Sequence, residues 1–510
     1  MKFFSRIYLI FFWKFFFVQI DKYNFNNLNF RHVDFTNYKK IKGLIFKDNL
    51  FKINNYHVNS FEFLNFSKNL GGKVGINVSK KNIFNWFKIN KYKLYFLWSS
   101  ELTARRLINI LYNYEFINSS LEKKESNRLK EIILFHIKRL LLEFNNLKYY
   151  DVDSYQLKAF VLSSIILKKD FTQVLFIVKK IISYQIDNIG MHKSYNILEH
   201  AKFINNLKEL KNIILFYNIK NSDFLDEAIG KLGLVLNQYY HLDGSLVIFN
   251  GSNNNYTKLI YNGLSKNEFY KTLKFIAINN GIAFYKDKNR RIYFDVVKPN
   301  QMGVSKNLNA GTLSFEISAY GEKLITNCGA SESSGKNPEY LRYSAAHSTI
   351  ILQNTNISEI KENNVHLKYP QNVSFSSENL DDKFIFEGSH NGYQKKFNKI
   401  IKRKITINKL KDKIIGEDFI INTGNKNEKV IYHIRFHLMP NISFNITNGK
   451  KNIILKSQLN NVWLFKSNTE LVMEDSILVD DNTTKHIQQI VIKGITNKNR
   501  EAIKWSIEKV

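Results

Sequence analysis

The chain has 510 residues, enough for two or three domains with sizeable cores, and 44% of them are hydrophobic, which excludes disorder as its main state. Its 75 Lys and Arg residues exceed its 44 Asp and Glu residues by 31, so nucleic acid, an anionic membrane surface and an acidic glycan are all compatible partners. AT-rich coding also produces many Lys and Asn residues with only 4 Pro, and this explanation of the charge stays open.

Two sequence features narrow the range of partners and of site types that this chain can have. No zinc-finger spacing, RNP-like aromatic motif or GxxxxGK[ST] loop is present, and Lys far outnumbers Arg, so we expect no nucleic-acid partner. The single cysteine, Cys328, excludes an intramolecular disulfide and a cysteine-rich metal site.

The first hydrophobic segment covers residues 3–18, FFSRIYLIFFWKFFFV. Arg6 and Lys14 interrupt it, so its uncharged run is far shorter than the roughly 20 residues that span a bilayer. No small-residue cleavage site follows, as a signal peptide would require. We predict an amphipathic helix packed on the protein, with a helix on a membrane surface as the alternative, and no integral membrane span.

Helical periodicity extends over residues 80–240. Leu107, Ile110, Leu111 and Tyr114 fall at i, i+3, i+4 and i+7, which places them on one face of a helix. The pattern recurs with short polar connections, and successive amphipathic helices must bury their hydrophobic faces against one another. The sequence therefore predicts an antiparallel helical array or toroid.

Short β-rich runs replace this pattern after about residue 285. Leu313, Phe315 and Ile317 alternate with other residues, and turn signals such as Gly321-Glu322 separate the runs. We predict a multidomain α + β protein, in which an N-terminal (α/α) toroid precedes a C-terminal antiparallel β-sandwich. The expected parts are a helical or irregular N-terminal segment (1–79), the toroid (80–240), a linker or crossover (241–288) and the sandwich (289–510).

Two local features stand out within the predicted sandwich. The tetrapeptide His390-Asn391-Gly392-Tyr393 is typical of a hairpin turn in which Asn-Gly adopts positive φ. A basic run follows it, and its side chains either contact a polyanion or form a solvated strand face, the more frequent arrangement. The run comprises Lys395, Lys396, Lys399, Lys402, Arg403 and Lys404.

Several segments resemble those of a known family. KNLNAGTLSFEIS (306–318), LITNCGA (324–330) and YSAAHSTIIL (343–352) are similar to strands of the heparinase II/III-type polysaccharide lyases, and later segments follow in the same order. In the helical half, GMHKSYN (190–196) and HLDG (241–244) resemble the family's active-site helix and the loop after a later helix. The resemblance covers nearly the whole chain and is most specific in the C-terminal half.

The resemblance implies β-elimination at a uronic acid, which requires neutralisation of the sugar carboxylate, removal of the C5 proton and release of the O4 leaving group. In such enzymes a Tyr or His is the base, Tyr, His or water is the acid, and Asn or Arg stabilises the aci-carboxylate. The matching positions give the catalytic candidates His192, Tyr195, Tyr240, His241 and His347. The substrate-binding candidates are Asn307, Asn309 and Arg342.

We expect the catalytic candidates to converge on one groove between the toroid and the sandwich, with Asn307 and Asn309 on its sandwich wall. Arg342 suits a substrate carboxylate because its guanidinium can bind one bidentately. For every candidate an ordinary structural role, such as capping, packing or a salt bridge, stays open.

The chain departs from the family at the metal-binding positions. Asn307 and Asn309 stand where many relatives carry two histidines, and Asn327 stands where metal-bearing relatives carry aspartate. Asn carbonyls are poor replacements for zinc ligands, and His347 alone cannot form a zinc site. We therefore predict no tightly bound zinc and no cofactor, and an activity that survives chelators.

These expectations combine into a polysaccharide lyase that cleaves an acidic, uronate-containing polysaccharide by β-elimination. The sugar, the linkage and the oligomeric state are not encoded in any motif. We expect a cell-envelope or periplasmic location, with the cytoplasm as the alternative because no clear cleavable signal peptide is present. The alternative function is non-catalytic binding of an acidic glycan by a protein that kept the fold after losing metal and catalytic histidines.

Overall fold

The computed structural model describes residues 22–25, 56–93, 96–254, 275–276, 281–299, 308–331, 338–360, 368–426, 428–447, 449–480 and 483–510. The helix predicted over residues 3–18 and the candidate Asn307 lie outside these ranges. The chain divides into two compact units. Unit 1 falls within Met1–Gly190 and Lys202–Lys231, and unit 2 comprises Met191–Ala201 and Leu232–Val510.

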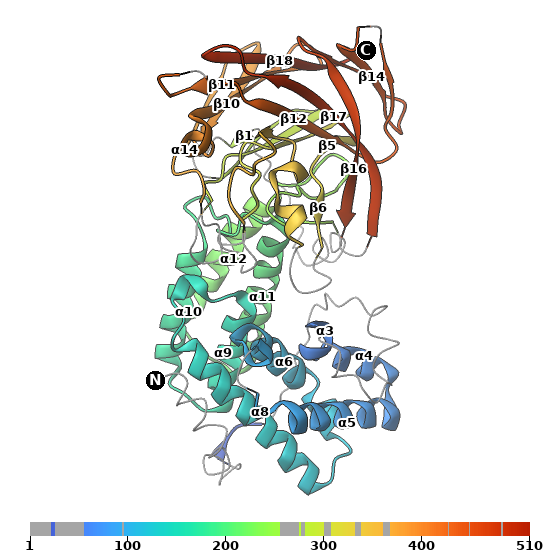
Figure 1. The fold of residues 1–510 in the computed structure, drawn as a ribbon. Helices are drawn as coiled ribbons and strands as arrows, with labels where there is room; N and C mark the ends of the chain where they lie inside the picture. The colour runs from blue at the N-terminus through green and yellow to red at the C-terminus, as the bar shows by residue number, and fades with distance from the viewer. Residues whose placement is uncertain are drawn as a thin grey trace. The chain divides into compact units, whose positions relative to one another are not determined.

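Unit 1 is helical, as the periodicity predicts (Figure 1). Helix α5 runs through residue 80, so the chain has no break at the boundary expected there. Helices α11 and α12 each pass from one unit to the other. The described α-helices before residue 240 are α3 (Tyr56–Asn59), α4 (Phe63–Leu70), α5 (Gly72–Asn90), α6 (Ser100–Tyr112), α7 (Tyr114–Asn118), α8 (Lys123–Phe144), α9 (Ser154–Ile166), α10 (Phe171–Gln185), α11 (Ile197–Phe216) and α12 (Asp223–Leu236).

Polar residues determine where several helices begin. At the start of α9, Asp153 accepts a hydrogen bond from the backbone N–H of Gln156, and the Gln156 side chain accepts one from the backbone N–H of Asp153. Ser99 and Asp170 accept backbone N–H groups at the starts of α6 and α10. Each contact satisfies an N–H that the first helical turn leaves without a partner.

Unit 2 contains two sheets. In the first, the strand order is β1-β2-β3-β4-β5-β12-β17-β16-β6, with β7 also paired to β12, and in the second it is β13-β14-β15-β18-β11-β10-β9-β8. Among the described strands, all pairs are antiparallel except the short pair of β6 and β16. Helices followed by antiparallel sheets confirm the predicted order of the two architectures.

The strands of the first sheet are β1 (Phe275–Ile276), β2 (Ile282–Lys286), β3 (Arg290–Asp295), β4 (Phe315–Ala319), β5 (Glu322–Thr326), β6 (Gly329–Ala330), β7 (Ile350–Leu352), β12 (Ile431–Leu438), β16 (Leu471–Asp480) and β17 (Thr483–Ile495). Those of the second are β8 (Val373–Asn379), β9 (Lys383–His390), β10 (Lys399–Asn408), β11 (Lys413–Asn422), β13 (Ser443–Ile446), β14 (Asn452–Lys456), β15 (Val462–Ser467) and β18 (Arg500–Lys509).

Aromatic side chains fill the space between the two sheets. Phe315 on β4 stacks on Trp505 of β18, with ring centroids 5.3 Å apart, and Phe436 on β12 packs against Phe465 of β15 at 4.9 Å. A Cβ on Gly416 of β11 would lie 2.0 Å from Cε2 of Trp505, so only glycine leaves room for that indole. One continuous hydrophobic core therefore joins the sheets into a sandwich.

A buried ion pair lies within this core. Arg403 on β10 and Asp418 on β11 are both 0% exposed, and Nε of the arginine lies 2.6 Å from Oδ1 of the aspartate. Nη1 of Arg403 also donates to the carbonyl oxygens of Leu313 and Ser348, both at 2.9 Å. The predicted basic strand face is therefore wrong for Arg403, and also for Lys399, which is buried. Side chains alternate along β10, so only part of the run faces outward.

The connection from β9 to β10 also differs from the predicted Asn-Gly turn. A short helix, α14 (Gln394–Phe397), forms there, and the left-handed residue is Asn398, with φ of 54°. Gly392 lies outside the positive-φ region. A Cβ on Gly392 would lie 2.8 Å from the carbonyl oxygen of Ile357, so this glycine permits close packing rather than a turn.

Candidate functional site

Two segments of unit 2, residues 308–314 and 342–349, lie against each other, and we term them the site loops. The backbone N–H of Ala310 donates to the carbonyl oxygen of Arg342 at 2.8 Å, and the Ser344 hydroxyl donates to the carbonyl oxygen of Ala310 at 2.7 Å. Both loops also accept hydrogen bonds from buried Arg403 of the second sheet. The sandwich core thereby fixes the backbone on which two candidates, Asn309 and His347, are carried.

Asn309 and His347 are buried polar side chains without hydrogen-bond partners in the described part of the chain. They are 3% and 2% exposed, and neither the amide atoms of Asn309 nor the ring nitrogens of His347 make a hydrogen bond. Gly311 packs against the imidazole so closely that a Cβ there would lie 2.9 Å from Cγ of His347. Because native structures rarely leave buried polar groups unpaired, these two residues are candidates for contacting a ligand.

Burial lowers the pKa of His347 to about 4, although the negative charge of Glu316 opposes the shift. The imidazole is therefore neutral at pH 7. A neutral imidazole has one nitrogen with a lone pair and one that carries hydrogen. His347 can consequently accept a proton and donate a hydrogen bond at the same time.

A buried charge cluster lies beside the site loops. Glu316 on β4 is 0% exposed, and its Oε2 lies 2.8 Å from Nζ of Lys323 on β5 and 2.9 Å from Nε2 of His241. Its Oε1 accepts from the amide of Asn327 at 2.9 Å, and Oδ1 of Asn327 accepts the backbone N–H of Ser348 at 2.9 Å. Glu316 thus connects the segment after α12 to the loop that carries His347.

Burial alone would raise the pKa of Glu316, but the ammonium group of Lys323 and the hydrogen bond from His241 outweigh it and hold that pKa well below its usual range. Burial and the same ammonium group lower the pKa of His241 below its ordinary value. At neutral pH an ionised Glu316 therefore pairs with Lys323, while a neutral His241 donates its Nε2–H to the carboxylate.

Asn250 connects two further candidates. Its Nδ2 donates to the carbonyl oxygen of Tyr195 at 3.4 Å, and its Oδ1 accepts the backbone N–H of Asn309 at 3.2 Å. Tyr195 and Asn250 both adopt positive φ, at 49° and 54°. Strained backbone of this kind is enriched at functional sites. The segment 191–201 and the first site loop are therefore held together through a single amide side chain.

His192 is held by a second histidine. Its backbone N–H donates to Nδ1 of His200 at 3.0 Å, while Nε2 of His200 donates to the carbonyl oxygen of Leu232 at 2.9 Å. Burial lowers the pKa of His200 to about 3 and that of His192 to about 4. Nδ1 of His192 lies 2.8 Å from the hydroxyl of Ser194. His192 is thus a neutral imidazole at pH 7.

The remaining described candidates contact the same framework. The carbonyl oxygen of Tyr240 accepts hydrogen bonds from the Tyr293 hydroxyl at 2.6 Å and from Arg291 at 2.5 Å, both on β3. Arg342 is 2% exposed, and its Nη2 donates to the carbonyl oxygen of Leu308 at 3.2 Å. All described candidates thus belong to unit 2. Tyr195, Asn309 and Arg342 are joined through the site loops, whereas His192 is held by His200 and Tyr240 by β3. The convergence of the candidates on one groove between the toroid and the sandwich stays a prediction.

The sequence patterns did not single out Asn250, Asp295, Glu316 or Lys323. Glu316 could have been recognised from the sequence, because it is a charged residue within the hydrophobic run LSFEIS. Every residue of β4 is buried, and a buried carboxylate needs a partner. Asn250 and Asp295 gave no such signal, since isolated polar residues beside turns are common in any chain.

The buried carboxyl group of Asp295, which accepts a hydrogen bond from Asn250, gives the first testable prediction about this site. Burial raises its pKa to about 7 from its ordinary 3.8, although hydrogen bonds from the N–H of Val297 and from Asn250 favour the carboxylate. Between these values the folded state binds a proton that the unfolded state releases, so stability falls as the pH rises. The contribution is fully present below about pH 4 and is lost above about pH 7.

We expect Asp295→Asn, which is neutral at every pH, to be more stable than the unsubstituted protein at about pH 8 and nearly equal to it at about pH 4. Urea unfolding at both pH values measures the difference. A stability gap of the same size at the two pH values would contradict a raised pKa.

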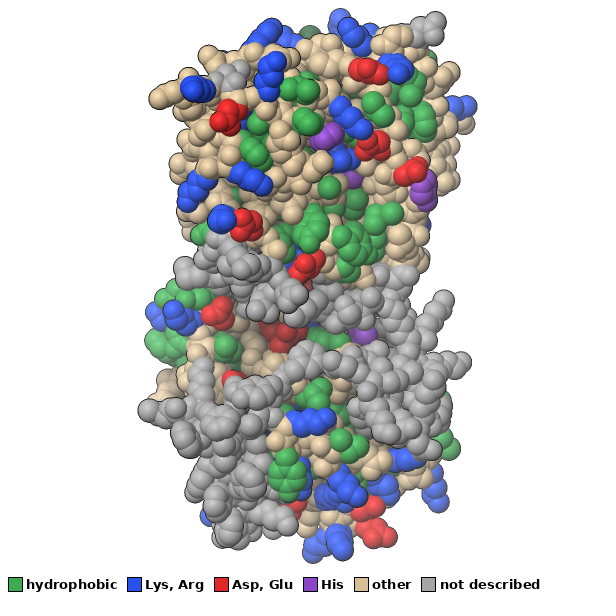
Figure 2. Space-filling model, viewed as in Figure 1, with side chains coloured by type: hydrophobic (Ala, Val, Ile, Leu, Met, Phe, Trp, Pro, Cys, Tyr) green, Lys and Arg blue, Asp and Glu red, His purple; other side chains and the backbone are tan. Residues whose placement is uncertain are grey.

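On the face shown in Figure 2, Lys and Arg side chains are scattered among Asp and Glu rather than gathered into one patch. Among the described residues, no group of three or more His, Cys, Asp or Glu side chains is placed to hold a metal ion. In the part of the chain that the structure covers, no helix combines the length and the hydrophobicity needed to cross a bilayer.

Comparison with known proteins shows which family the strand-rich half of the chain is similar to. A family model described as "Heparinase II/III-like, C-terminal" matches residues 275–506. The match confirms the resemblance predicted from the sequence, and both site loops lie within the matched region.

Solved structures extend the likeness to most of the chain. A heparinase III structure aligns with a TM-score of 0.68 and 13% identity, covering 89% of this chain and 77% of that one. A mutant of a heparan sulfate lyase from Pedobacter heparinus aligns with a TM-score of 0.60 and 12% identity, covering 89% and 76%. No curated protein matches the sequence. At this identity the structures show the fold, and they confirm the predicted toroid and sandwich.

Proposed function

We propose that the chain is a polysaccharide lyase that cleaves a uronate-containing acidic polysaccharide by β-elimination. The observation that carries the proposal is the pair Asn309 and His347, two buried polar side chains that lack partners among the described residues and lie in adjacent loops of a heparinase II/III-like domain. The similar solved structures include a heparinase III and a heparan sulfate lyase, which favours the same class of substrate for this chain.

In the proposed reaction, the neutral imidazole of His347 accepts the C5 proton of the uronate through its lone-pair nitrogen. The amide of Asn309 donates to the sugar carboxylate, on which negative charge builds up as that proton leaves. The C4–C5 double bond forms while the C4–O4 bond breaks, and a tyrosine, Tyr195 or Tyr240, gives its proton to the departing O4. His192, also neutral at pH 7, is the second candidate base.

His241 and Arg342 receive supporting roles in this proposal. His241 donates to Glu316, and Arg342 donates to the carbonyl oxygen of Leu308, so each already has a partner within the protein. We assign them to holding the site loops in place. The envelope location expected from the sequence belongs to the same proposal.

One observation favours a second candidate function, binding of an acidic glycan without cleavage. Asn309 and Asn327 stand where the resemblance places a histidine and an aspartate. Asn327 uses both its amide oxygen and its amide nitrogen inside the protein, in bonds to Ser348 and Glu316. A chain that has exchanged metal-binding side chains for structural ones can keep the fold and lose the chemistry.

Elimination leaves an unsaturated uronate at the new non-reducing end, and its double bond absorbs ultraviolet light. The proposal is tested by incubating the purified protein with a panel of uronate polysaccharides, both sulfated and unsulfated, and following that absorbance. An increase that is lost when Asn309 and His347 are both replaced supports lyase activity at this site, and a loss on replacing His192 and Tyr195 together assigns these two residues to it. Glycan binding by calorimetry without any absorbance change would support the second candidate and reject the first.

The asparagines at the family's metal-binding positions, Asn309 and Asn327, also predict how the activity responds to chelators. Because Asn327 is engaged and Asn309 is a poor zinc ligand, we expect less than about twofold loss of elimination after dialysis against a chelator. Elemental analysis of the dialysed protein accompanies the assay. Stoichiometric zinc that survives dialysis, or activity restored only by added zinc, would contradict the prediction.

A further inference from the structure

One stretch of unit 1 departs from the mixed distribution of charges that Figure 2 shows. No Asp or Glu occurs between Glu62 and Glu101, whereas seven lysines do, and helix α5 carries four of these lysines. AT-rich coding raises the number of lysines along the whole chain, so it does not explain why acidic residues are missing from this stretch. A segment with charge of one sign suits an anionic partner.

One side of α5 is committed to the interior of unit 1. Trp86 and Phe87 are buried, and Nε1 of Trp86 donates to the side chain of Asn59 at 2.9 Å. The ring of Phe87 packs against that of Phe135 on α8, with centroids 5.2 Å apart. These contacts fix the rotation of the helix about its axis, and therefore also which side chains face outward.

The outward side of α5 combines hydrophobic and basic residues. Exposed or half-buried side chains recur at intervals of four, three, four and three residues, which places them in one stripe along the helix. The stripe comprises Val74, Val78, Lys81, Asn85 and Lys88. Val74 is 60% exposed, and Ile89, which follows Lys88, is 56% exposed. We term the stripe together with Lys73 and Ile89 the α5 face.

Two lysines of the α5 face have no partner within the part of the chain that the structure describes. Lys73 and Lys88 are exposed, and neither ammonium group makes a hydrogen bond or an ion pair there. They are fifteen residues apart on one helix, which corresponds to about 22 Å along its axis. A single small anion cannot contact both, so their spacing suits an extended anionic surface.

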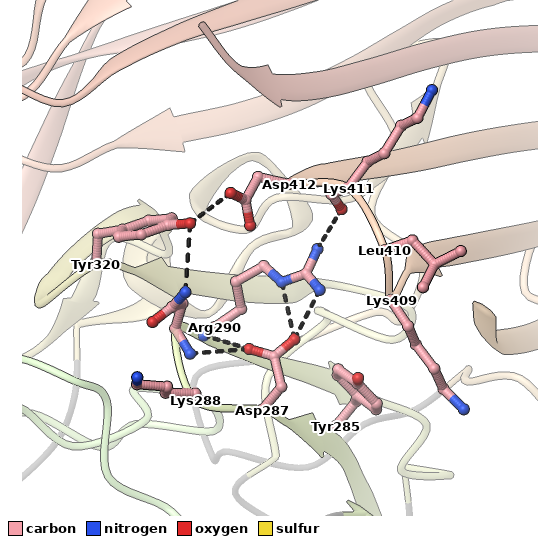
Figure 3. A pocket seen from close by; sticks show the side chains of 10 residues that line it. Tyr285, Asp287, Lys288, Arg290, Tyr320, Lys409, Leu410, Lys411 and Asp412 are labelled. Carbon is pink, nitrogen blue, oxygen red and sulfur yellow. Dashed lines mark hydrogen bonds and ion pairs between the residues drawn. The ribbon is translucent and has the colours of Figure 1, made fainter. Parts of the chain in front are cut away.

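The concave alternative for an anion is a cavity of about 390 Å³ among three turns of unit 2 (Figure 3). Asp287 in its wall pairs with Arg290, whose Nη2 lies 2.7 Å away. The side chains of Lys288 and Lys411 point away from the cavity and from each other (Figure 3). The lysines at its rim therefore do not form an anion site.

The hydrophobic residues of the α5 face decide which anionic surface fits. A polysaccharide or a nucleic acid that binds through its charges gains little from an exposed valine and isoleucine. The boundary between lipid headgroups and acyl chains accepts both kinds of residue, because aliphatic side chains enter the boundary while lysines extend their ammonium groups to the phosphates. With 19 residues and four lysines, α5 suits a position parallel to that boundary.

We propose that the α5 face docks unit 1 on the surface of an anionic lipid bilayer, with α5 parallel to the membrane plane. Lys73 and Lys88 contact lipid phosphates, and Val74 and Ile89 enter the boundary with the acyl chains. The inference goes beyond the proposed reaction and is independent of it, since none of these residues belongs to the candidate site.

The test measures binding of the full chain to vesicles by flotation. One set of vesicles holds about 30% phosphatidylglycerol in phosphatidylcholine, and the other holds phosphatidylcholine alone. Lys73→Gln with Lys88→Gln removes the two charges, and Val74→Gln with Ile89→Gln removes the aliphatic surface. Lys485→Gln with Lys498→Gln, two exposed lysines of unit 2, is the control with the same change in net charge. All six positions are exposed, and melting curves check that each variant folds.

We expect the unsubstituted protein to bind the anionic vesicles at least about tenfold more tightly than the neutral ones. Each pair of substitutions on the α5 face should weaken binding to the anionic vesicles about tenfold, and the control pair less than about twofold. Equal binding to both kinds of vesicle overturns the proposal, as do equal effects of the α5 lysine pair and the control pair.

A heparan sulfate octasaccharide, titrated by calorimetry, tests the rival occupant. If the lysine pair weakens octasaccharide binding about tenfold while the aliphatic pair leaves vesicle binding unchanged, the α5 face is a polyanion site and the membrane proposal is wrong. Vesicle binding that survives both pairs on the α5 face also overturns the proposal, because the membrane contact then lies elsewhere in the chain.

Discussion

Replacing His347 with alanine is expected to lower the rate of elimination by about 10²–10⁴-fold, the usual contribution of a positioned proton-transfer group, while changing the melting temperature little. The large loss of rate and the small change in melting temperature have the same cause. Neither ring nitrogen of His347 bonds to the described part of the protein, so the substitution removes no internal hydrogen bond there. It does leave a cavity beside Gly311, a packing loss that a truncated histidine at any buried position shares.

His437 provides the matched control. It is also a buried neutral histidine, but its Nδ1 lies 2.8 Å from the hydroxyl of Ser476 and its Nε2 donates to the carbonyl oxygen of Ala345 at 3.1 Å. Burial lowers its pKa to about 3. We expect His437→Ala to lower the melting temperature clearly, because it strands two partners, and to lower the activity per folded molecule less than His347→Ala does, because it loosens the second site loop at Ala345 without removing the proton acceptor.

Melting curves and initial rates of uronate elimination, measured on both variants, check this contrast. A His347→Ala protein with full activity would falsify the assignment of His347 to the chemistry. A large fall in its melting temperature, matching that of His437→Ala, would instead give His347 a structural role.

The architecture could be predicted from the sequence because periodicity reports directly on burial. The face formed by Leu107, Ile110 and Leu111 is buried in α6, and Phe315 and Ile317 lie in a fully buried strand. Asn309 and His347 were found through motif resemblance. Their lack of partners could not be found in that way, because it depends on which groups surround them in space.

The misassigned residues show where linear patterns fail. Arg403 belongs to a run of lysines, and a basic run on a strand is typical of solvated surface. Strand alternation and a carboxylate on the neighbouring strand placed it in the core instead. Asn250 and Asp295 were missed for a related reason. They contact Tyr195, Asn309 and each other only after distant segments have come together, and no local pattern encodes that.

The buried pair of Arg403 and Asp418 gives the largest expected effect on stability. Arg403→Met keeps much of the side-chain volume but leaves Asp418 charged at 0% exposure, where the indole N–H of Trp505 still donates to it at 2.9 Å. Breaking a buried pair in this way costs about 3–5 kcal/mol of unfolding free energy. It also removes the hydrogen bonds to the carbonyl oxygens of Leu313 and Ser348, so the site loops lose their anchor.

Lys404→Met is the matched control, since Lys404 is the next residue on the same strand and points to the opposite, partly exposed face. We expect it to change the unfolding free energy by less than about 0.5 kcal/mol. Combining Arg403→Met with Asp418→Leu removes the stranded charge and should recover part of the loss. Urea unfolding of the four proteins measures these differences, and elimination rates of the folded variants report on the loops.

Equal destabilisation by Arg403→Met and Lys404→Met would show that the ion pair does not hold the sandwich together. Recovery of stability in the double variant without recovery of activity would instead separate the two tasks of Arg403, neutralising a buried carboxylate and fixing the backbone that carries Asn309 and His347.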